Sequence, residues 1–355
     1  MENKQVGIQP ISPQTMRFRT MTLAIAVGTL LMTVKFMAYF LTNSAAILSD
    51  AFESIINVVA SGFALYSIYR SSQPPDATHP YGHGKIEYFS VGFEGALIIL
   101  AAVAILYKAV PAFFQIRVLE ELNAGIVLML GTSAVNLAMG IFLIRTGRRT
   151  RSVPLEADGK HLLTDVYTSA GVVVGLVLVR LTGWNGWDPI AACAVAANIL
   201  FTGWHLVKTS FGRLMDEADP ELLAKIVDIL NRHRSPDWID IHHLRTRHYG
   251  DKVHVDFHLV VPRSFSLLEA HTQAKKIENL ILDSLPQVAE VIVHVDPCED
   301  PLCRVCRQYK CEDRSAENED SGSTWRVEEV VMKRVHRENA AGSRQEAAGS
   351  RNSEI

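Results

Sequence analysis

The sequence has little net charge, few cysteines and no recognisable secretion signal. Its 355 residues have a formal net charge of -3, so nothing in the overall charge suggests nucleic acid as a partner. Five cysteines in a chain of this size do not indicate a disulfide scaffold. The polar residues 1–19 lack the features of a cleavable signal peptide. The motif H-E-x-x-H is absent too, which argues against an intramembrane metalloprotease, and we expect no enzymatic activity.

Apolar residues are concentrated in residues 20–210. Hydrophobic residues make up 48% of the whole chain. A membrane-spanning helix needs about 20 mostly apolar residues. Six segments meet this condition, at about residues 20–41, 45–70, 87–110, 123–146, 161–182 and 188–208. The sequence therefore predicts an all-α bundle of six transmembrane helices in a lipid bilayer, preceded by the N-terminal segment 1–19.

Lysine and arginine are unevenly distributed around the six predicted spans. Basic residues precede the first span, follow the sixth, and lie in the second-to-third and fourth-to-fifth loops, whereas the other loops contain few. Because basic loops face the cytosol, both termini are expected to be cytosolic. We expect a multi-pass protein of the bacterial inner membrane. Lys35, within the first span, is expected to extend its ammonium group to the outer face.

The pattern changes after the sixth span. Residues 218–233 have the apolar spacing of an amphipathic helix, and residues 252–261 alternate between apolar and polar side chains as in a half-buried strand. A second helix is predicted to start at Ser266, which with Glu269 has the spacing of a capping box. Residues 288–297 are predicted to form another strand.

These elements predict a small cytosolic two-layer α+β domain of ferredoxin-like type over residues 211–298. The remaining residues, 299–355, contain three of the cysteines and few apolar side chains. A segment of that composition cannot bury enough apolar surface to fold, so we expect it to be mostly disordered.

Polar and ionisable residues occur at matching spacing in the second and fifth spans. Glu53 and Asn57 are four residues apart, and so are His161 and Asp165. Residues at i and i+4 share one helix face, and ionisable groups in a membrane usually face a cavity or a substrate path. Together they offer carboxylate, amide and imidazole donors, a set that suits a divalent first-row metal such as zinc. The alternative is that these residues only join helices through hydrogen bonds.

The loop "PPDATHPYGHGKIEYFS" between the second and third spans holds another group of candidate ligands. Asp76, His79 and His83 follow one another at intervals of three and four residues. Two histidines and an acid in a Pro/Gly-rich loop can form a small metal site. A turn with solvated histidines is the alternative.

The predicted cytosolic domain contains many histidines, and its strands also carry aspartates. The candidate metal ligands are His242, His258, His271, His294 and Asp296. In the alternative interpretation they are exposed residues on the polar face of a sheet. Further on, "DPCEDPLCRVCRQYKC" contains Cys298, Cys303, Cys306 and Cys311, with one C-x-x-C pair, so the four thiols are a candidate structural zinc site.

Three of these stretches together resemble the cation diffusion facilitator (CDF) family of transporters over about residues 15–298. They are "HPYGHGKIEYFS", "ADGKHLLTDVYTSAGVVVG" and "LRTRHYGDKVHVDFHL…VIVHVDP". The resemblance implies a homodimer that exports divalent metal, zinc first among the candidates, from the cytosol in exchange for protons by alternating access. A membrane-anchored metal sensor or assembly protein with little transport is the rival function.

The resemblance also assigns roles to residues. It implies that Glu53, Asn57, His161 and Asp165 form the transport site, that the loop group binds metal, and that the cytosolic group forms a binuclear site that stabilises the dimer. It further implies a salt bridge of Lys85, for which Asp216 is the expected partner.

One departure from the family pattern leaves the metal open. Zinc transporters of the family usually have Asp or His followed by Asp where this chain has Glu53 and Asn57. Iron(II), cobalt(II) or manganese(II) are therefore alternative cargoes. Asp50, one turn before Glu53, and Glu94 in the third span are candidates for an accessory ligand or a proton relay.

Overall fold

The structure is a computed structural model with two compact units. It describes residues 12–42, 45–112, 122–184, 186–300, 302–304, 306–308, 311, 314–315 and 324–331. The first unit comprises Met1–Met215 and Tyr249–Asp251, and the second comprises Asp216–His248 and Lys252–Ile355. Each unit has its own core.

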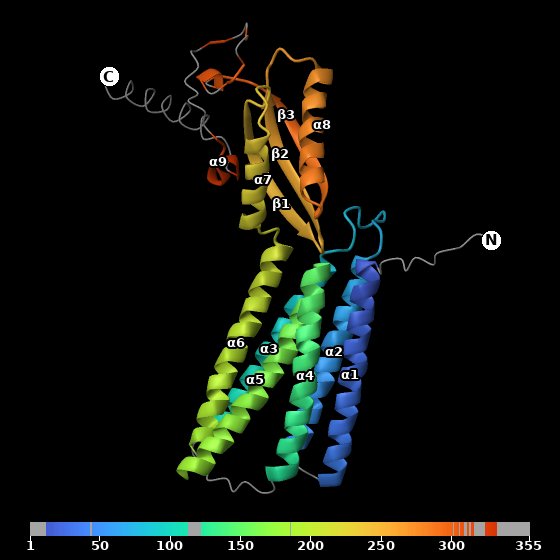
Figure 1. Ribbon diagram of the computed structural model, residues 1–355, viewed down its shortest axis with the longest axis vertical. Coiled ribbons are helices and arrows are strands. Elements are labelled where there is room, and N and C mark those ends of the chain that lie inside the picture. The colour runs from blue at the N-terminus through green and yellow to red at the C-terminus, as the bar shows by residue number, and fades with distance from the viewer. Residues whose placement is uncertain are drawn as a thin grey trace, which may run out of the picture. The chain divides into compact units, whose positions relative to one another are not determined.

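The first unit is a bundle of long helices (Figure 1). They are α1 (Pro13–Thr42), α2 (Ala45–Ser71), α3 (Ile86–Ala112), α4 (Leu122–Thr150), α5 (Val153–Thr182) and α6 (Trp187–Leu214). Each of the six predicted spans falls on one of them. The helices α1, α4, α5 and α6 continue by several residues past one end of the predicted apolar runs, because a helix does not have to stop where its apolar sequence stops.

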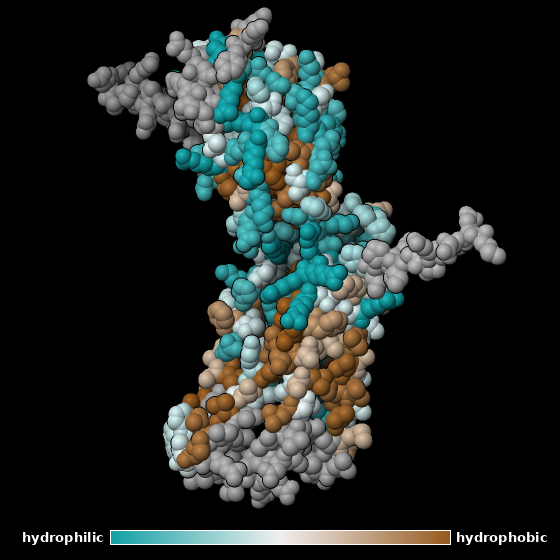
Figure 2. All heavy atoms as spheres, viewed as in Figure 1, coloured by the Kyte–Doolittle hydropathy of each residue, from teal (hydrophilic) through white to brown (hydrophobic). Residues whose placement is uncertain are grey.

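The outer surface of this bundle is strongly apolar (Figure 2). Large side chains such as Leu181, Phe201 and Leu30 are exposed there, as expected for surfaces that contact lipid rather than water. Among the described residues, Pro13–Met37 and Ile86–Tyr107 are long and apolar enough to cross a membrane on composition alone. The helices α2 and α5 contain the polar residues of the predicted site.

Close helix contacts at glycine hold α5 against α4. A Cβ atom added to Gly159 of α5 would lie 2.7 Å from Cγ1 of Ile144 and 2.9 Å from the carbonyl oxygen of Gly140, both in α4. Helices in membranes approach closely through such small residues. The contact therefore fixes the position of α5 between Asp158 and His161.

The second unit is a three-stranded sheet with two helices on one face (Figure 1). Its elements are α7 (Pro220–Arg232), β1 (Asp240–Tyr249), β2 (Lys252–Val261), α8 (Leu267–Ser284), β3 (Val288–Pro297), a 3-10 turn η1 (Leu302–Arg304) and α9 (Val327–Val331). The strand order is β1-β2-β3, and β2 pairs with β3 in parallel. The strand β1 was not among the predicted elements.

Strand β2 separates an apolar face of the sheet from a polar one. Its alternate residues Val255, Phe257 and Leu259 are buried in the core beneath α7 and α8. The residues between them, including Asp256 and His258, lie on the opposite face, which the two helices leave open. The apolar/polar alternation that the sequence predicts for residues 252–261 therefore places the polar side chains of β2 on the open face of the sheet.

Helix α8 begins at the predicted capping box. The Ser266 hydroxyl accepts a hydrogen bond from the Glu269 amide, and the Glu269 carboxylate accepts one from the Ser266 amide. Part of the segment expected to be disordered packs on this unit as well: Trp325 and Val330 belong to the core, and Asn231 exchanges two hydrogen bonds of 2.9 Å with the backbone of Trp325.

Candidate metal transport site

Three of the four predicted transport ligands lie in contact between α2 and α5. The amide nitrogen of Asn57 donates to Oδ2 of Asp165 at 2.9 Å, and its Oδ1 lies 2.8 Å from Nε2 of His161. Glu53 lies one turn before Asn57 on α2, but its side chain, like that of Asp50, is outside the described part of the chain. The helical spacing of the two pairs therefore produces a shared N/O cluster.

The hydrogen bonds of Asn57 define the protonation of His161. Because the amide nitrogen faces a carboxylate, the amide oxygen faces the imidazole and can only accept. His161, whose side chain is buried, therefore has its proton on Nε2 in this arrangement. A cation bound by Oδ1 and Nε2 would replace both hydrogen bonds and require that proton to move or leave.

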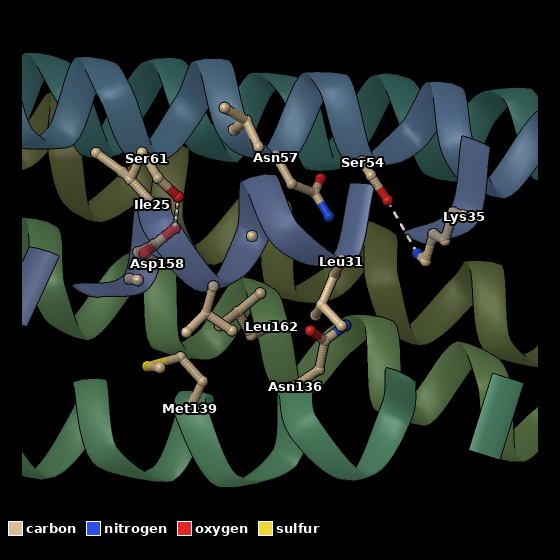
Figure 3. A pocket seen from close by; sticks show the side chains of 14 residues that line it. Ile25, Leu31, Lys35, Ser54, Asn57, Ser61, Asn136, Met139, Asp158 and Leu162 are labelled. Atoms are coloured by element: carbon tan, nitrogen blue, oxygen red, sulfur yellow. Dashed lines mark hydrogen bonds between the residues drawn. The ribbon is translucent and has the colours of Figure 1, made fainter. Parts of the chain in front are cut away.

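A narrow cavity of about 30 Å³ adjoins Asn57 between α1, α2, α4 and α5 (Figure 3). Its polar lining consists of Lys35, Ser54, Asn57, Ser61, Asn136 and Asp158. A buried water needs about 10–15 Å³ of such space, so the cavity has room for about two.

Two buried carboxylates lie beside the cluster. Asp158 and Glu94 are 1% and 2% exposed. Ser61 donates to Oδ1 of Asp158 at 2.8 Å, while Oδ2 of Asp158 and both oxygens of Glu94 have no hydrogen-bond partner among the described residues. The carboxylates of Asp158 and Asp165 are close enough to Glu94 to act on it electrostatically. Buried carboxylates need a proton or a cation beside them.

Asp158 was not among the predicted site residues. It precedes His161 by three residues and therefore shares its helix face, a signal that the sequence did offer. The expectation for Lys35 was wrong. Its ammonium group is buried and donates to the Ser54 hydroxyl at 2.9 Å (Figure 3), because a polar partner inside the bundle replaces the water of the membrane surface.

The loop residues Asp76, His79 and His83 come together as a group whose ligand atoms lie within 4.8 Å of one another. Asp76 lies 3.3 Å from both imidazoles, one oxygen to each. Hydrogen bonds from the Thr78 hydroxyl and the His79 amide hold the pKa of Asp76 well below its usual range. The carboxylate is thus charged and pre-positioned for a cation.

The predicted ion pair of Lys85 and Asp216 stays a prediction. Within the first unit, the Lys85 ammonium donates to the carbonyl of Leu214 at 3.3 Å. Asp216 belongs to the second unit.

On the open face of the cytosolic sheet, Asp296 contacts three histidines. Its Oδ2 lies 2.9 Å from Nδ1 of His258 and 3.5 Å from Nε2 of His242, and its Oδ1 lies 3.2 Å from Nε2 of His294. The ligand atoms of His242, His258 and Asp296 lie within 4.8 Å of one another. His271 is exposed on α8 and is not part of this group.

Two features of the sheet bring these ligands together: the register between β2 and β3, and an irregularity in β1. His258 and His294 are paired across β2 and β3, so their rings are 4.5 Å apart. His243 has a left-handed backbone, with φ of 54°, and after it the buried positions of β1 change parity. Such an irregularity is typical of a β-bulge, and it puts His242 and His243 side by side near His258.

Comparisons with known proteins identify the family of this chain. A model of the cation efflux transmembrane domain matches residues 21–215, and one of the cation efflux protein cytoplasmic domain matches residues 218–298. The uncharacterized transporter sll1263 of Synechocystis is 36% identical over 79% of this chain and 90% of its own length. The cation-efflux pumps FieF of Citrobacter koseri and Escherichia coli K12 are 29% and 28% identical, each over 78% of this chain and 91% of their own. The chain therefore belongs to the cation efflux, or cation diffusion facilitator, family and is a multi-pass membrane transporter of cations rather than an enzyme.

Proposed function

We propose that this transporter exports divalent metal from the cytosol in exchange for protons, and that Glu53, Asn57, His161 and Asp165 bind the transported ion. The observation that supports the proposal best is the direct contact of Asn57 with both His161 and Asp165. A hydrogen-bonded cluster that joins two helices inside an apolar bundle can exchange its internal bonds for bonds to a cation.

The donor set favours zinc as the cargo. Imidazole nitrogen and carboxylate oxygen are regular zinc ligands, and two carboxylates neutralise the charge of one M²⁺ ion in a region of low dielectric. The amide oxygen of Asn57 is a weaker, uncharged donor. Iron(II), cobalt(II) and manganese(II) accept such N/O sets too and remain the alternative cargoes.

Proton exchange is supported by the groups around the cluster. The metal can bind only when His161 gives up the Nε2 proton that it now donates to Asn57. Glu94 and Asp158 are buried carboxylates beside the cluster and are proposed to take up and release the protons. The cavity that Asn57 and Asp158 both line has room for about two water molecules, which would connect the cluster to Asp158.

Alternating access then follows from the position of the cluster. Its ligands come from two helices, so a small relative motion of α2 and α5 can expose the ion to one side of the membrane or the other. With the cluster open to the cytosol, metal displaces protons. With the cluster open to the opposite side, incoming protons displace the metal.

The loop group and the cytosolic group are proposed to sense cytosolic metal. The cytosolic domain matches a family of dimerisation domains, and we infer a homodimer with both termini in the cytosol. The exposed His271 fits a ligand that one protomer offers to metal held by its partner. Metal would thus stabilise the dimer when export is needed.

Reconstituted liposomes test the proposal. A metal-sensitive dye and a pH-sensitive dye inside the vesicles should report opposite, simultaneous fluxes of zinc and protons, and collapse of the proton gradient should stop zinc accumulation. Zinc binding without zinc flux would favour the rival, a metal-binding sensor. Zinc flux that is indifferent to the proton gradient would contradict the exchange mechanism.

A further inference from the structure

The cysteine block, defined as Cys298, Cys303, Cys306 and Cys311, is a second cluster of soft metal ligands. Its spacing, C-x4-C-x2-C-x4-C, is symmetric about the central pair. The family model for the cytoplasmic domain ends at residue 298, so most of the block lies beyond what the family match covers. All four thiols are free.

The block packs on the open face of the cytosolic sheet, at the end of β2. Val260 points to this face and is nevertheless fully buried. It is covered by a small apolar cluster that contains Cys298, Leu302 and Cys306. The amide of Cys298 donates to the carbonyl of Val261 at 2.9 Å, which ties the start of the block to the strand.

The thiols have the surroundings of a metal site. The Arg314 guanidinium donates to the carbonyl of Cys303 at 3.0 Å and to that of Cys306 at 3.4 Å. A zinc ion with four thiolate ligands has a net charge of minus two, and an adjacent arginine would offset part of it.

A backbone amide also donates a hydrogen bond to one of the block sulfurs. The amide of Arg263 donates to Sγ of Cys298 at 3.4 Å. An amide donor of this kind orients the sulfur, as groups around a metal ligand commonly do.

The described part of this segment is mostly irregular. Its only regular element among the described residues is the three-residue turn η1. Gln308 donates to Asp237, which also accepts from Gln273 at 3.0 Å. A short irregular segment whose only core is this small apolar cluster gains further fold stability from a bound metal.

We propose that the cysteine block binds one zinc ion as a structural site, which fastens the C-terminal segment to the cytosolic domain. Thiolates select zinc over harder cations, and cytosolic thiols stay reduced and available. The block is not among the groups whose ligand atoms already lie within 4.8 Å of one another, so binding must draw the sulfurs together. Each thiol that becomes a ligand releases its proton to solvent. This site is separate from the transport proposal and does not depend on it.

Cobalt(II) substitution tests the site in the full-length protein in detergent. After chelator treatment under reducing conditions, added cobalt should produce an intense near-ultraviolet thiolate-to-cobalt charge-transfer band. The histidine and aspartate groups contain no sulfur and cannot give it. The band should disappear in Cys306→Ser and persist in Cys193→Ser, a matched variant in α6 outside the block. Zinc should displace cobalt and abolish the band.

A second measurement needs no variant. The four block thiols should react slowly with a maleimide in the zinc-loaded protein, because thiols bound to zinc are protected. After chelation they should react at least about tenfold faster. Equal rates before and after chelation, a cobalt complex without the charge-transfer band, or disulfides between block cysteines in freshly purified protein would each overturn the proposal.

Discussion

Replacing Asp165 by asparagine should abolish metal binding at the transport site while leaving the bundle intact. The new amide has nearly the same shape, and its oxygen can still accept the hydrogen bond that Asn57 donates to Asp165 at 2.9 Å. The fold should therefore persist. What the variant loses is one of the two negative charges proposed to neutralise the divalent ion.

Electrostatics gives a lower bound on the free energy of zinc binding that the variant loses. Two unit charges about 4 Å apart attract with about 4 kcal/mol at an effective dielectric constant of about 20. A cation with two charges in direct contact gains at least as much. Because each 1.4 kcal/mol corresponds to a factor of about ten, zinc affinity should fall by at least about 700-fold.

Glu156→Gln is the matched control, because it removes a carboxylate from the same helix at a different place. Glu156 lies 3.2 Å from Lys160 and 3.7 Å from Arg148, in partly exposed ion pairs. Such pairs contribute about 0–1 kcal/mol. Zinc uptake into liposomes should fall to background in Asp165→Asn and stay near that of the parent in Glu156→Gln. Equal transport by the parent and Asp165→Asn would refute the site, and so would an equal loss in both variants.

Three further outcomes are expected. Gly159→Ala should destabilise the bundle by about 1–3 kcal/mol, because the new methyl group overpacks against α4. Gly62→Ala should not destabilise it, because a Cβ atom at Gly62 would have open space around it. The temperature at which half of the protein remains monodisperse in detergent measures both effects. Thr78→Ala should raise the pKa of Asp76, because the Thr78 hydroxyl is the main group that lowers it. Because its pKa is lowered, Asp76 is charged and stabilises its turn at any pH above the usual aspartate pKa, and this stabilisation is lost as the pH falls through the lowered pKa. Carboxyl NMR titration should show that Asp76 becomes protonated at a higher pH in the variant. His271→Ala should leave the metal-free protein unchanged but raise the zinc concentration needed for dimerisation, as sedimentation would detect; an unchanged zinc dependence would exclude His271 as a shared ligand.

Periodicity was sufficient for the helices and for β2, because both rest on burial of a repeating apolar face. The same periodicity brings Asn57 to His161 and Asp165, since residues four apart stay on one side of a helix. The register between β2 and β3 likewise pairs His258 with His294. The side of the helix or strand on which each of these residues lies depends on local sequence alone, whereas their meeting depends on how the elements pack.

Other features depend on contacts that the sequence does not encode locally. Strand β1 has a polar sequence, and its parity changes at the left-handed His243, so no simple alternation marks it. Lys35 is buried because Ser54 of another helix lies within hydrogen-bond distance, a contact set by the packing of α1 on α2. Trp325 joins the core of the cytosolic unit from a segment too polar to predict a fold.

If the transported ion passes between α2 and α5 through the cluster at Asn57, zinc should be found there. Zinc-edge anomalous diffraction can locate it in crystals of a variant in which the loop and cytosolic groups are disabled by His79→Ala and His258→Ala. We expect one strong intramembrane peak within bonding distance of His161 and Asp165, lost in Asp165→Asn. Full zinc transport by this variant with no zinc peak between these helices would contradict it.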